Sequence, residues 1–527
     1  MRRFVTSLVA ILSAVQIVAQ QLPERPKLVV TITVDQLRTD LLYLFYEAFG
    51  ENGFKKLINQ GAVSFDMAFP FDNLDQSNSV ATIFTGTTPF YHGVVGNEIY
   101  NPKRNVHTPL LLDREYMGNF SPETLSPRAL LTSTVSDELK VASDNLSEVY
   151  SVAPTAEQAI LSAGHASNAA FWIDNTTGMW ATSTYYRDAP YYFENYNITE
   201  PLNQRIEESD WSLQNSPSFY RYLPFSQRDF GFKHTFSKSK LDNVKLYKQT
   251  PLVNQEVGRF VSLLFKNSTL GKRTNPDLLN ISYFAGSYQG RSISDNALEI
   301  QDTYIRLDQE IARLLHEIDA NVGLKNTLVV LTSTGYFDAS VDSPERMRIP
   351  TGDFYPRRAT SLLNVYLMAI YGQGQWVDGY SNGELYLNRK LIDDKQISLS
   401  EIQTKSAEFL VQMSGVQDVV CSHTLMHGMT NDANQLQRNR YHRKLSGDLL
   451  LEFQPGWCIN YEGEKKNQQV RASTFSAPLI FFGANIVPQK IERTVFATEI
   501  APTVCSFLRI RAPNGSREKP IRELFRR

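Results

Sequence analysis

An aspartate at the end of an apolar run is the first residue of this chain that could do chemistry. The segment RPKLVVTITVDQLRTD, residues 25 to 40, places Asp35 directly after the run from Val29 to Val34. A carboxylate that is removed from water is costly unless a partner compensates its charge. Asp35 is therefore a candidate site residue, and its partner must come from elsewhere in the chain.

The histidines do not form a clear set of metal ligands. Eight are present, at positions 92, 107, 165, 234, 316, 423, 427 and 442. His423 and His427 are four residues apart, a spacing that can place two ligands on one face of a helix. Turn-forming residues and the lack of a clear third ligand nearby argue against a zinc site there. Ser77 and Ser79 carry hydroxyls, but such residues at a helix start usually accept backbone N–H groups.

Alternating strands and helices are predicted to position these groups. The run from Val29 to Val34 predicts a strand, and VYSVAP followed by TAEQAILSAGH repeats the order of strand and helix. LLNISYFAG and NTLVVLTSTG predict two further buried strands, and between them one helix face carries Ile300, Tyr304, Leu307, Ile311, Leu314 and Ile318. This pattern predicts an α/β fold with a mostly parallel sheet and helices on both faces.

The functional cleft of such a sheet lies outside the carboxyl ends of its strands. Asp35, Ser287 and Thr334 fall at these ends. Segments rich in Tyr, Asn, Ser and Pro, at about 101 to 130, 175 to 250 and 373 to 460, interrupt the alternation and are interpreted as cap insertions in one domain, residues 21 to 527.

The composition predicts a globular protein with a large core. Of 527 residues, 42% are hydrophobic and 20% charged, and 53 Lys and Arg against 55 Asp and Glu give a net charge of −2. This balance does not favour nucleic acid or an anionic membrane as a partner. The three cysteines, Cys421, Cys458 and Cys505, indicate no disulfide framework.

The first twenty residues are typical of a cleaved export signal. Met1 to Gln20 contains two arginines, an apolar stretch from Phe4 to Val18 and the small residue Ala19 near its end. The apolar stretch is short for a membrane span, and no cysteine for a lipid anchor is near it. We therefore expect a periplasmic protein without a transmembrane segment in the mature chain.

Six segments together resemble the alkaline phosphatase superfamily. They are VVTITVDQLRTD, ATIFTGTTPFYHGVVGN, ISYFAGSYQGRS, TLVVLTSTGY, SAPLIFFGANI and TEIAPTVCSFL. The pattern T-G-x-x-P-x-x-H-G from Thr85 to Gly93, with Asn97 four residues on, is the most specific piece. The chain is most similar to the exported bacterial phosphate-monoesterase branch, which is related to the nucleotide pyrophosphatase/phosphodiesterases.

The resemblance implies two zinc ions that clamp the attacking and leaving oxygens. Asp35 matches the first ligand of that family. The Thr or Ser nucleophile falls on Gln76, whose amide does not attack phosphorus. An Asp-x-x-x-His ligand pair falls on Ser287 and Arg291.

The remaining family positions are also changed. An Asp-His ligand pair falls on Thr334 and Gly335, and the Lys-x-Arg pair that holds phosphate falls on Thr155 and Glu157. The last histidine ligand should precede SAPLIFFG, but residues 460 to 480 contain no histidine. Asn97 matches a residue that hydrogen-bonds phosphate in the family. An Asn in such a turn can equally form a hydrogen bond with the nearby backbone.

These substitutions predict a protein that keeps the fold without the chemistry. A catalytic zinc site needs about three protein ligands, and one aspartate does not supply them. We expect no cofactor and a non-catalytic role as a binding or scaffold subunit with a protein partner in the cell envelope. The alternative is an active metal-dependent phosphatase or phosphodiesterase with rearranged ligands.

Arg291 is a candidate partner for the negative charge of Asp35. It is a new cation at a family ligand position, and a guanidinium can bind a carboxylate through two parallel hydrogen bonds. We expect Arg291 to pair with Asp35, helped by the polar groups of Gln76 and Thr334. The alternative is that Arg291 turns to solvent and Asp35 accepts backbone N–H groups of the following helix.

Overall fold

The computed structural model describes residues 24–186, 190–223, 231–237, 242–340, 351–427, 432–461, 467–470 and 475–525. The predicted export signal, Met1 to Gln20, lies outside these residues. Within them, no helix combines the length and the apolar character that crossing a bilayer requires.

Within the described residues, a mixed sheet of eleven strands forms the centre of the protein. Its order is β21-β2-β20-β12-β1-β11-β6-β7-β8-β5, and β22 pairs with β2. The strands are β1 (Leu28–Asp35), β2 (Ala62–Ala68), β5 (Gly118–Asn119), β6 (Val149–Ala153), β7 (Ala169–Ile173), β8 (Trp180–Ser183), β11 (Asp277–Phe284), β12 (Thr327–Ser333), β20 (Ala477–Gly483), β21 (Gln489–Lys490) and β22 (Val495–Phe496). Strands β12, β1, β11, β6 and β7 are parallel neighbours, whereas β20 and β8 run antiparallel to the strands that they join. The predicted mostly parallel sheet is confirmed.

The apolar runs form strands because both faces of the sheet are covered. Every residue of β1 is buried. Val30, Ile32 and Val34 pack into one hydrophobic core, and Val29 packs into a second core on the opposite face. A strand buried on both faces is apolar throughout, which is why the run before Asp35 does not alternate.

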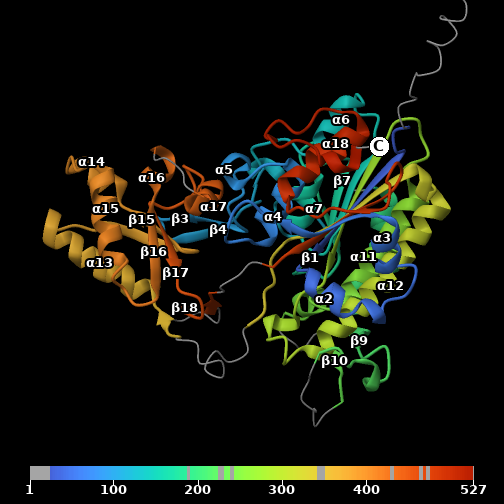
Figure 1. Cartoon of the computed structure of the whole chain (residues 1–527), viewed down its shortest axis with the longest axis horizontal. Coiled ribbons are helices and arrows are strands. Elements are labelled where there is room, and N and C mark those ends of the chain that lie inside the picture. Colours follow the sequence, from blue (N-terminus) through green and yellow to red (C-terminus); the bar gives the residue numbers. More distant parts are fainter. Residues whose placement is uncertain are drawn as a thin grey trace, which may run out of the picture.

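Helices cover both faces of this sheet (Figure 1). Residues of α11 and α12 belong to the first core, and residues of α4, α7 and α18 belong to the second. The helices of this main domain are α2 (Thr39–Leu44), α3 (Phe54–Gln60), α4 (Gln76–Thr85), α5 (Pro89–His92), α6 (Val135–Ala142), α7 (Ala156–Ala163), α8 (Tyr191–Thr199), α9 (Leu202–Glu208), α10 (Asn243–Lys248), α11 (Pro251–Asn267), α12 (Ala297–Asn321) and α18 (Ile500–Leu508).

Residues 353–427 and 432–460 form an outer lobe with a sheet of its own, at the left of Figure 1. Its sheet order is β14-β15-β17-β16. Buried Leu363 and Trp376 belong to a core that is separate from the two cores of the main sheet. The lobe contains the segment 373 to 460 that was predicted as an insertion, together with α13 before it. Its elements are α13 (Pro356–Tyr371), β14 (Val377–Ser381), β15 (Glu384–Leu387), α14 (Arg389–Asp394), α15 (Leu399–Leu410), β16 (Val416–Cys421), α16 (Ser422–His427), α17 (Asp432–Arg440) and β17 (Leu449–Phe453), with β13 (Asp353–Phe354) and β18 (Cys458–Asn460), which pair with each other next to β19 (Asn467–Gln469).

The two other predicted insertions lie against the main domain. The segment 101 to 130 contributes to a hairpin of β3 (Glu98–Asn101) and β4 (Val106–Pro109) and supplies the edge strand β5. The segment 175 to 250 contains α8, α9, α10 and a short pair of β9 (Asp210–Trp211) and β10 (His234–Thr235). Its Phe193 and Trp211 are fully buried in the first core.

Candidate active site

Asp35 lies at the carboxyl end of β1, between β11 and β12. Its side chain is buried, with the residue 3% exposed. The next residue, Gln36, has a left-handed backbone with φ of 63°, and its N–H donates to Thr334 Oγ1 at 2.9 Å. This turn sends the chain away from the sheet and leaves the Asp35 carboxylate at the strand end, where the fold predicts the cleft.

Neutral side chains donate to both oxygens of the Asp35 carboxylate. Gln76 Nε2 donates to Oδ2 at 3.0 Å, and Thr334 Oγ1 donates to Oδ1 at 2.9 Å. Burial raises the pKa of Asp35, while hydrogen bonds from Thr334, Gln76 and Tyr336 act in the opposite direction. The predicted help from Gln76 and Thr334 is therefore confirmed.

Gln76 connects Asp35 to a second strand end. Its Oε1 accepts a hydrogen bond of 2.7 Å from Thr155 Oγ1, and Thr155 is the N-terminal cap of α7, which follows β6. Glu157 is half-buried in the first turn of the same helix. Three strand ends, those of β6, β1 and β12, are thus joined by one chain of hydrogen bonds.

A capping box fixes the start of α4, and with it the position of Gln76. The side chain of Asp75 accepts from the N–H of Asn78 at 2.8 Å, and Asn78 Oδ1 accepts from the N–H of Asp75 at 2.9 Å. Asn97 joins this cap, because its N–H donates to Asp75 Oδ2 at 3.0 Å and its Oδ1 accepts from the N–H of Ser77 at 3.3 Å. Burial raises the pKa of Asp75 to about 6.

The predicted pairing of Arg291 with Asp35 is wrong. Arg291 is exposed, and its Nη2 donates to Gln289 Oε1 at 2.9 Å. Gln289 has φ of 56°, so the chain turns sharply here and directs Arg291 outward. Ser287 faces inward, where its Oγ donates to the carbonyl oxygen of Arg291 at 2.7 Å and accepts from Asn296 Nδ2 at 2.7 Å.

Gly335 is required by packing. Its φ is 75°, and a Cβ at this position would lie 2.4 Å from a ring carbon of Phe69. A histidine has no room here without moving Phe69. The residue before it, Thr334, is the one of this pair that reaches Asp35.

The side chains described around Asp35 do not fit a two-zinc site. The groups that donate to its carboxylate are an amide and hydroxyls. Nowhere among the described residues do three His, Cys, Asp or Glu side chains come together in a group that could hold a metal ion.

The histidines singled out in the sequence lie elsewhere. His423 and His427 belong to α16 in the outer lobe, and His423 Nδ1 lies 2.7 Å from Gln403 Oε1. His92 is fully buried; its Nε2 lies 3.1 Å from Thr82 Oγ1 and its Nδ1 accepts from the N–H of Val94. Burial lowers the pKa of His92 to about 3, so it is a neutral structural residue.

Sequence reasoning missed two groups at this edge of the sheet. Tyr336, two residues after Thr334, hydrogen-bonds Asp35. Lys248 is buried in the segment interpreted as a cap, and its Nζ donates to the carbonyl oxygen of Ile173 and to Asn175 Oδ1, just after β7. Burial lowers the pKa of Lys248 to about 8, although the charge of Glu157 acts in the opposite direction. Tyr336 could have been found as the tyrosine of TSTGY, whereas Lys248 has no signal in its own segment.

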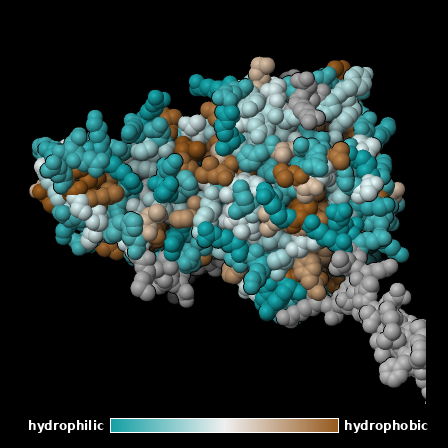
Figure 2. Space-filling view, turned by 90° about the horizontal axis from the view of Figure 1, so that it is seen from above, coloured by the Kyte–Doolittle hydropathy of each residue, from teal (hydrophilic) through white to brown (hydrophobic). Residues whose placement is uncertain are grey.

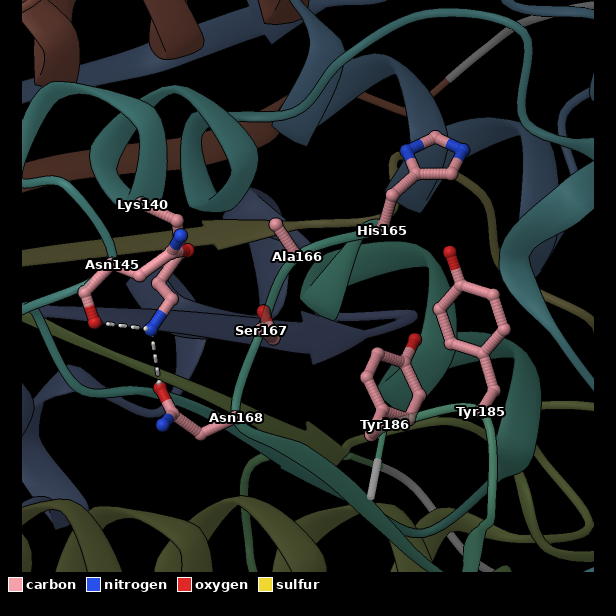
Figure 3. A pocket seen from close by; sticks show the side chains of 8 residues that line it. All are labelled: Lys140, Asn145, His165, Ala166, Ser167, Asn168, Tyr185 and Tyr186. Carbon is pink, nitrogen blue, oxygen red and sulfur yellow. Dashed lines mark hydrogen bonds between the residues drawn. The ribbon is translucent and has the colours of Figure 1, made fainter.

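A polar cavity of about 160 Å³ lies at the other end of the sheet (Figure 3). It is bordered by residues that precede β6 and β7 and by residues that follow the antiparallel β8, namely Lys140, Asn145, His165, Ala166, Ser167, Asn168, Tyr185 and Tyr186. Lys140 Nζ donates to the carbonyl oxygen of Asn145 at 3.1 Å and to Asn168 Oδ1 at 3.2 Å. This cavity is therefore separate from the Asp35 site.

Comparisons with known proteins match almost the whole chain. Residues 29–476 match the family described as Type I phosphodiesterase / nucleotide pyrophosphatase. The chain is 30% identical to a protein of Myroides odoratus named calcium-transporting ATPase, over 96% of each chain. It is 29% identical to alkaline phosphatase PafA of Elizabethkingia meningoseptica, over 95% of each chain. The crystal structure of wild-type PafA superposes with a TM-score of 0.81 and 27% identity, over 95% of this chain and 99% of PafA.

These comparisons contradict the prediction of a non-catalytic scaffold that is not an enzyme and uses no cofactor. Similar proteins over nearly the full length are named as enzymes, including alkaline phosphatases. The expectation of no cofactor is contradicted by the same comparisons, because the resemblance implies zinc for such proteins, even though the side chains around Asp35 do not form the two-zinc arrangement. The prediction rested on the changed ligand and nucleophile positions alone, and the similarity to proteins named as enzymes speaks against it.

Proposed function

Because the chain belongs to the Type I phosphodiesterase / nucleotide pyrophosphatase family, within the alkaline phosphatase superfamily, we propose that it hydrolyses phosphate esters. Phosphate monoesters are the first substrates to test, since relatives that match it along its length are named alkaline phosphatases. The observation that carries the proposal is the agreement with the PafA structure over 95% of this chain.

The reaction is placed at the carboxyl end of β1. Asp35 is buried there and bound by Gln76 and Thr334, Thr155 binds Gln76, and Asn97 binds the capped start of the helix that carries Gln76. Asn97 Oδ1 accepts from a backbone N–H, which leaves its amide N–H groups as donors for a phosphate oxygen. In this proposal Gln76 and Thr334 hold the Asp35 carboxylate in a fixed orientation at the site.

The experiment measures hydrolysis of p-nitrophenyl phosphate and of bis(p-nitrophenyl) phosphate by the purified chain. Each assay is run as purified, with added zinc and with a chelator, so that a dependence on metal ions is measured directly. We expect turnover that Asp35→Asn lowers by at least about tenfold. Asp394→Asn, at an exposed position of α14, is the matched control and should keep the activity.

Two results would overturn the proposal. One is the absence of turnover above buffer, with zinc supplied, from a preparation shown to be folded by circular dichroism. The other is turnover that Asp35→Asn leaves unchanged, since that activity would come from a contaminant or from another part of the chain.

We also propose that the chain is exported to the periplasm with Met1 to Gln20 as a cleaved signal. The two arginines and the apolar stretch of this segment support it. Fractionation of cells that express the tagged full-length chain, against one lacking residues 1 to 20, should recover only the first in the periplasmic fraction. A protein partner in the envelope stays a prediction.

A further inference from the structure

Helix α13 of the outer lobe is apolar on both of its sides. Ala359, Leu363 and Leu367 are buried against the lobe's own core. On the opposite side, Leu362 is 45% exposed and Val365 is 59% exposed. A surface helix typically turns its apolar side chains toward the core and polar ones outward, so these exposed apolar residues depart from the usual pattern.

The exposed apolar side chains and the half-buried Tyr366 form one patch. Leu362, Tyr366 and Ile370 follow one another at intervals of four residues, which places them in one row along the helix, and Val365 lies beside this row. Ile370 is 45% exposed, and the ring of Tyr366 stacks on Phe409 of α15, with 4.5 Å between centroids. We call Leu362, Val365, Tyr366 and Ile370 the α13 patch.

The patch faces away from the main domain. Helices α13 and α15 lie on the side of the lobe's sheet that is remote from the central sheet (Figure 1). Brown, apolar side chains are visible at the lobe's end of the molecule in Figure 2. A contiguous apolar patch on a surface indicates an interaction site, and this one is far from the carboxyl ends of the central strands.

Charge differs between the two ends of α13. Arg357 and Arg358 are exposed in its first turn, and neither forms an ion pair with any residue that the structure describes. At the last residue of the helix, Tyr371 OH donates to Glu401 at 2.9 Å, and Glu401 is exposed. The unpaired carbonyl groups of the helix C-terminus add partial negative charge to that end.

A surface with an apolar centre, a basic end and an acidic end is complementary to itself when one copy is turned end over end. We propose that the α13 patch binds the same patch of a second copy of this chain, with the two α13 helices antiparallel about a twofold axis near Tyr366. Leu362 of each copy then lies opposite Ile370 of the other. Arg357 and Arg358 of each copy reach the end of the other helix that carries Glu401, as an isologous twofold interface requires.

The size of the α13 patch determines how strong a dimer we expect. The sixteen residues of α13 make a helix about 24 Å long, and one helix pair buries less than the roughly 800 Å² per partner of a standard interface. The dimer should therefore be weak and should dissociate on dilution.

Sedimentation velocity of the full chain over a hundredfold concentration range tests the proposal. We expect a monomer at the low end and a dimer at the high end. Val365→Glu places a charge at the centre of the patch and should abolish the dimer. Val141→Glu is the matched control, since Val141 is a 62% exposed valine of a helix, α6, in the main domain, and it should leave the dimer unchanged.

A charge exchange tests the antiparallel arrangement. Arg357→Glu with Arg358→Glu should weaken the dimer at least tenfold, and adding Glu401→Arg to the same chain should restore part of the loss because each charge then meets its opposite in the other copy. A wild-type chain that stays monomeric throughout, or equal effects of Val365→Glu and Val141→Glu, would overturn the proposal. So would a monomer that binds vesicles of phosphatidylethanolamine and phosphatidylglycerol through Val365, since a lipid surface would then be what covers the patch.

Discussion

Gln76 is the residue on which the Asp35 network depends most. Its amide donates to Asp35 and accepts from Thr155, so it holds two strand ends together. Gln76→Ala removes the amide donor to Oδ2 of a buried carboxylate, and losing a hydrogen bond to a buried group costs about 1–3 kcal/mol. We expect the free energy of unfolding, measured by urea denaturation, to fall by this amount.

Gln412→Ala is a suitable control for that measurement. Gln412 is exposed just after α15, and its Nε2 donates to the carbonyl oxygen of Glu408. Its replacement should change the free energy of unfolding by less than about 0.5 kcal/mol. Equal losses for Gln76→Ala and Gln412→Ala would mean that the Asp35 carboxylate is not stabilised by Gln76.

His165 gives the stability of the protein a dependence on pH. Its Nδ1 lies 3.1 Å from Asp137 Oδ2 and its Nε2 lies 3.0 Å from the carbonyl oxygen of Leu130, so both nitrogens face acceptors. Burial alone lowers the pKa of His165, but the hydrogen bond and charge of Asp137 outweigh it and the pKa is raised. A raised pKa in the folded state stabilises the protein below the unfolded value of about 6.5, and this contribution disappears as the pH rises through the folded value.

The loss of stability in His165→Gln should accordingly be larger at about pH 5.5 than at about pH 8.5. Urea denaturation of wild type and variant at both values measures it. His316→Gln, at an exposed position of α12, should show the same difference from wild type at both pH values. A His165→Gln difference that does not change with pH would contradict the account of a protonated His165.

The sequence predicted where the site lies better than it predicted the contacts within it. Asp35 could be placed at a strand end because an apolar run stops there. Thr334 could be placed at the end of another strand for the same reason. The direction of Arg291 could not be predicted, since it depends on the left-handed backbone of Gln289, a residue whose type does not demand that conformation. Gly335 is likewise explained by Phe69, which is distant in the sequence.

At the scale of elements, Glu256 of α11 fastens the segment 175 to 250 to the main domain. It is 1% exposed and accepts from Trp180 Nε1 at 2.9 Å, from Tyr196 OH at 3.1 Å and from Arg205 Nη2 at 2.9 Å. Glu256→Ala removes the acid from a partly buried pair, which leaves Arg205 uncompensated and costs about 3 kcal/mol. We expect that loss in urea denaturation, together with faster amide hydrogen exchange in α8 and α9.

An exposed ion pair supplies the comparison. Glu408 pairs with Lys405 at 2.9 Å on the surface of α15, and Glu408→Ala should cost no more than about 1 kcal/mol. If hydrogen exchange in α8 and α9 is the same in Glu256→Ala and wild type, some other contact attaches this segment.

The strands of the sheet were easier to predict than the lobe. A strand buried on both faces is an uninterrupted apolar run, and β1, β11 and β12 each lie within about two residues of the predicted bounds. Helix α13 has a similar apolar content, but its outer face is exposed, so composition alone does not reveal that it begins the separate core of the outer lobe.

For the whole molecule, the β3–β4 hairpin is a bridge between the main domain and the outer lobe (Figure 1). Tyr100 of β3 lies against Tyr386 of β15, with 5.0 Å between ring centroids. A Cβ at Gly379 of β14 would lie 1.9 Å from the Tyr100 hydroxyl oxygen. Gly379→Ala should therefore displace Tyr100 and speed tryptic cleavage in the hairpin, where Lys103 and Arg104 are exposed.

Two further variants test this cause. Gly231→Ala should leave the cleavage rate unchanged, because nothing lies within 4 Å of a Cβ at that position. Adding Tyr100→Phe to Gly379→Ala removes the hydroxyl and should recover part of the protection. Unchanged cleavage in Gly379→Ala would show that the hairpin is held on the lobe by other contacts.

The position of β20 late in the sequence affects how the sheet forms while the chain is being synthesised. β20 pairs with β12, yet the whole outer lobe is translated between these two neighbours. During that interval one edge of β12 has no strand to pair with, and an open edge invites pairing with other chains. A ribosome that stops within the lobe thus releases a product with an incomplete sheet, which should aggregate rather than persist as a smaller folded protein.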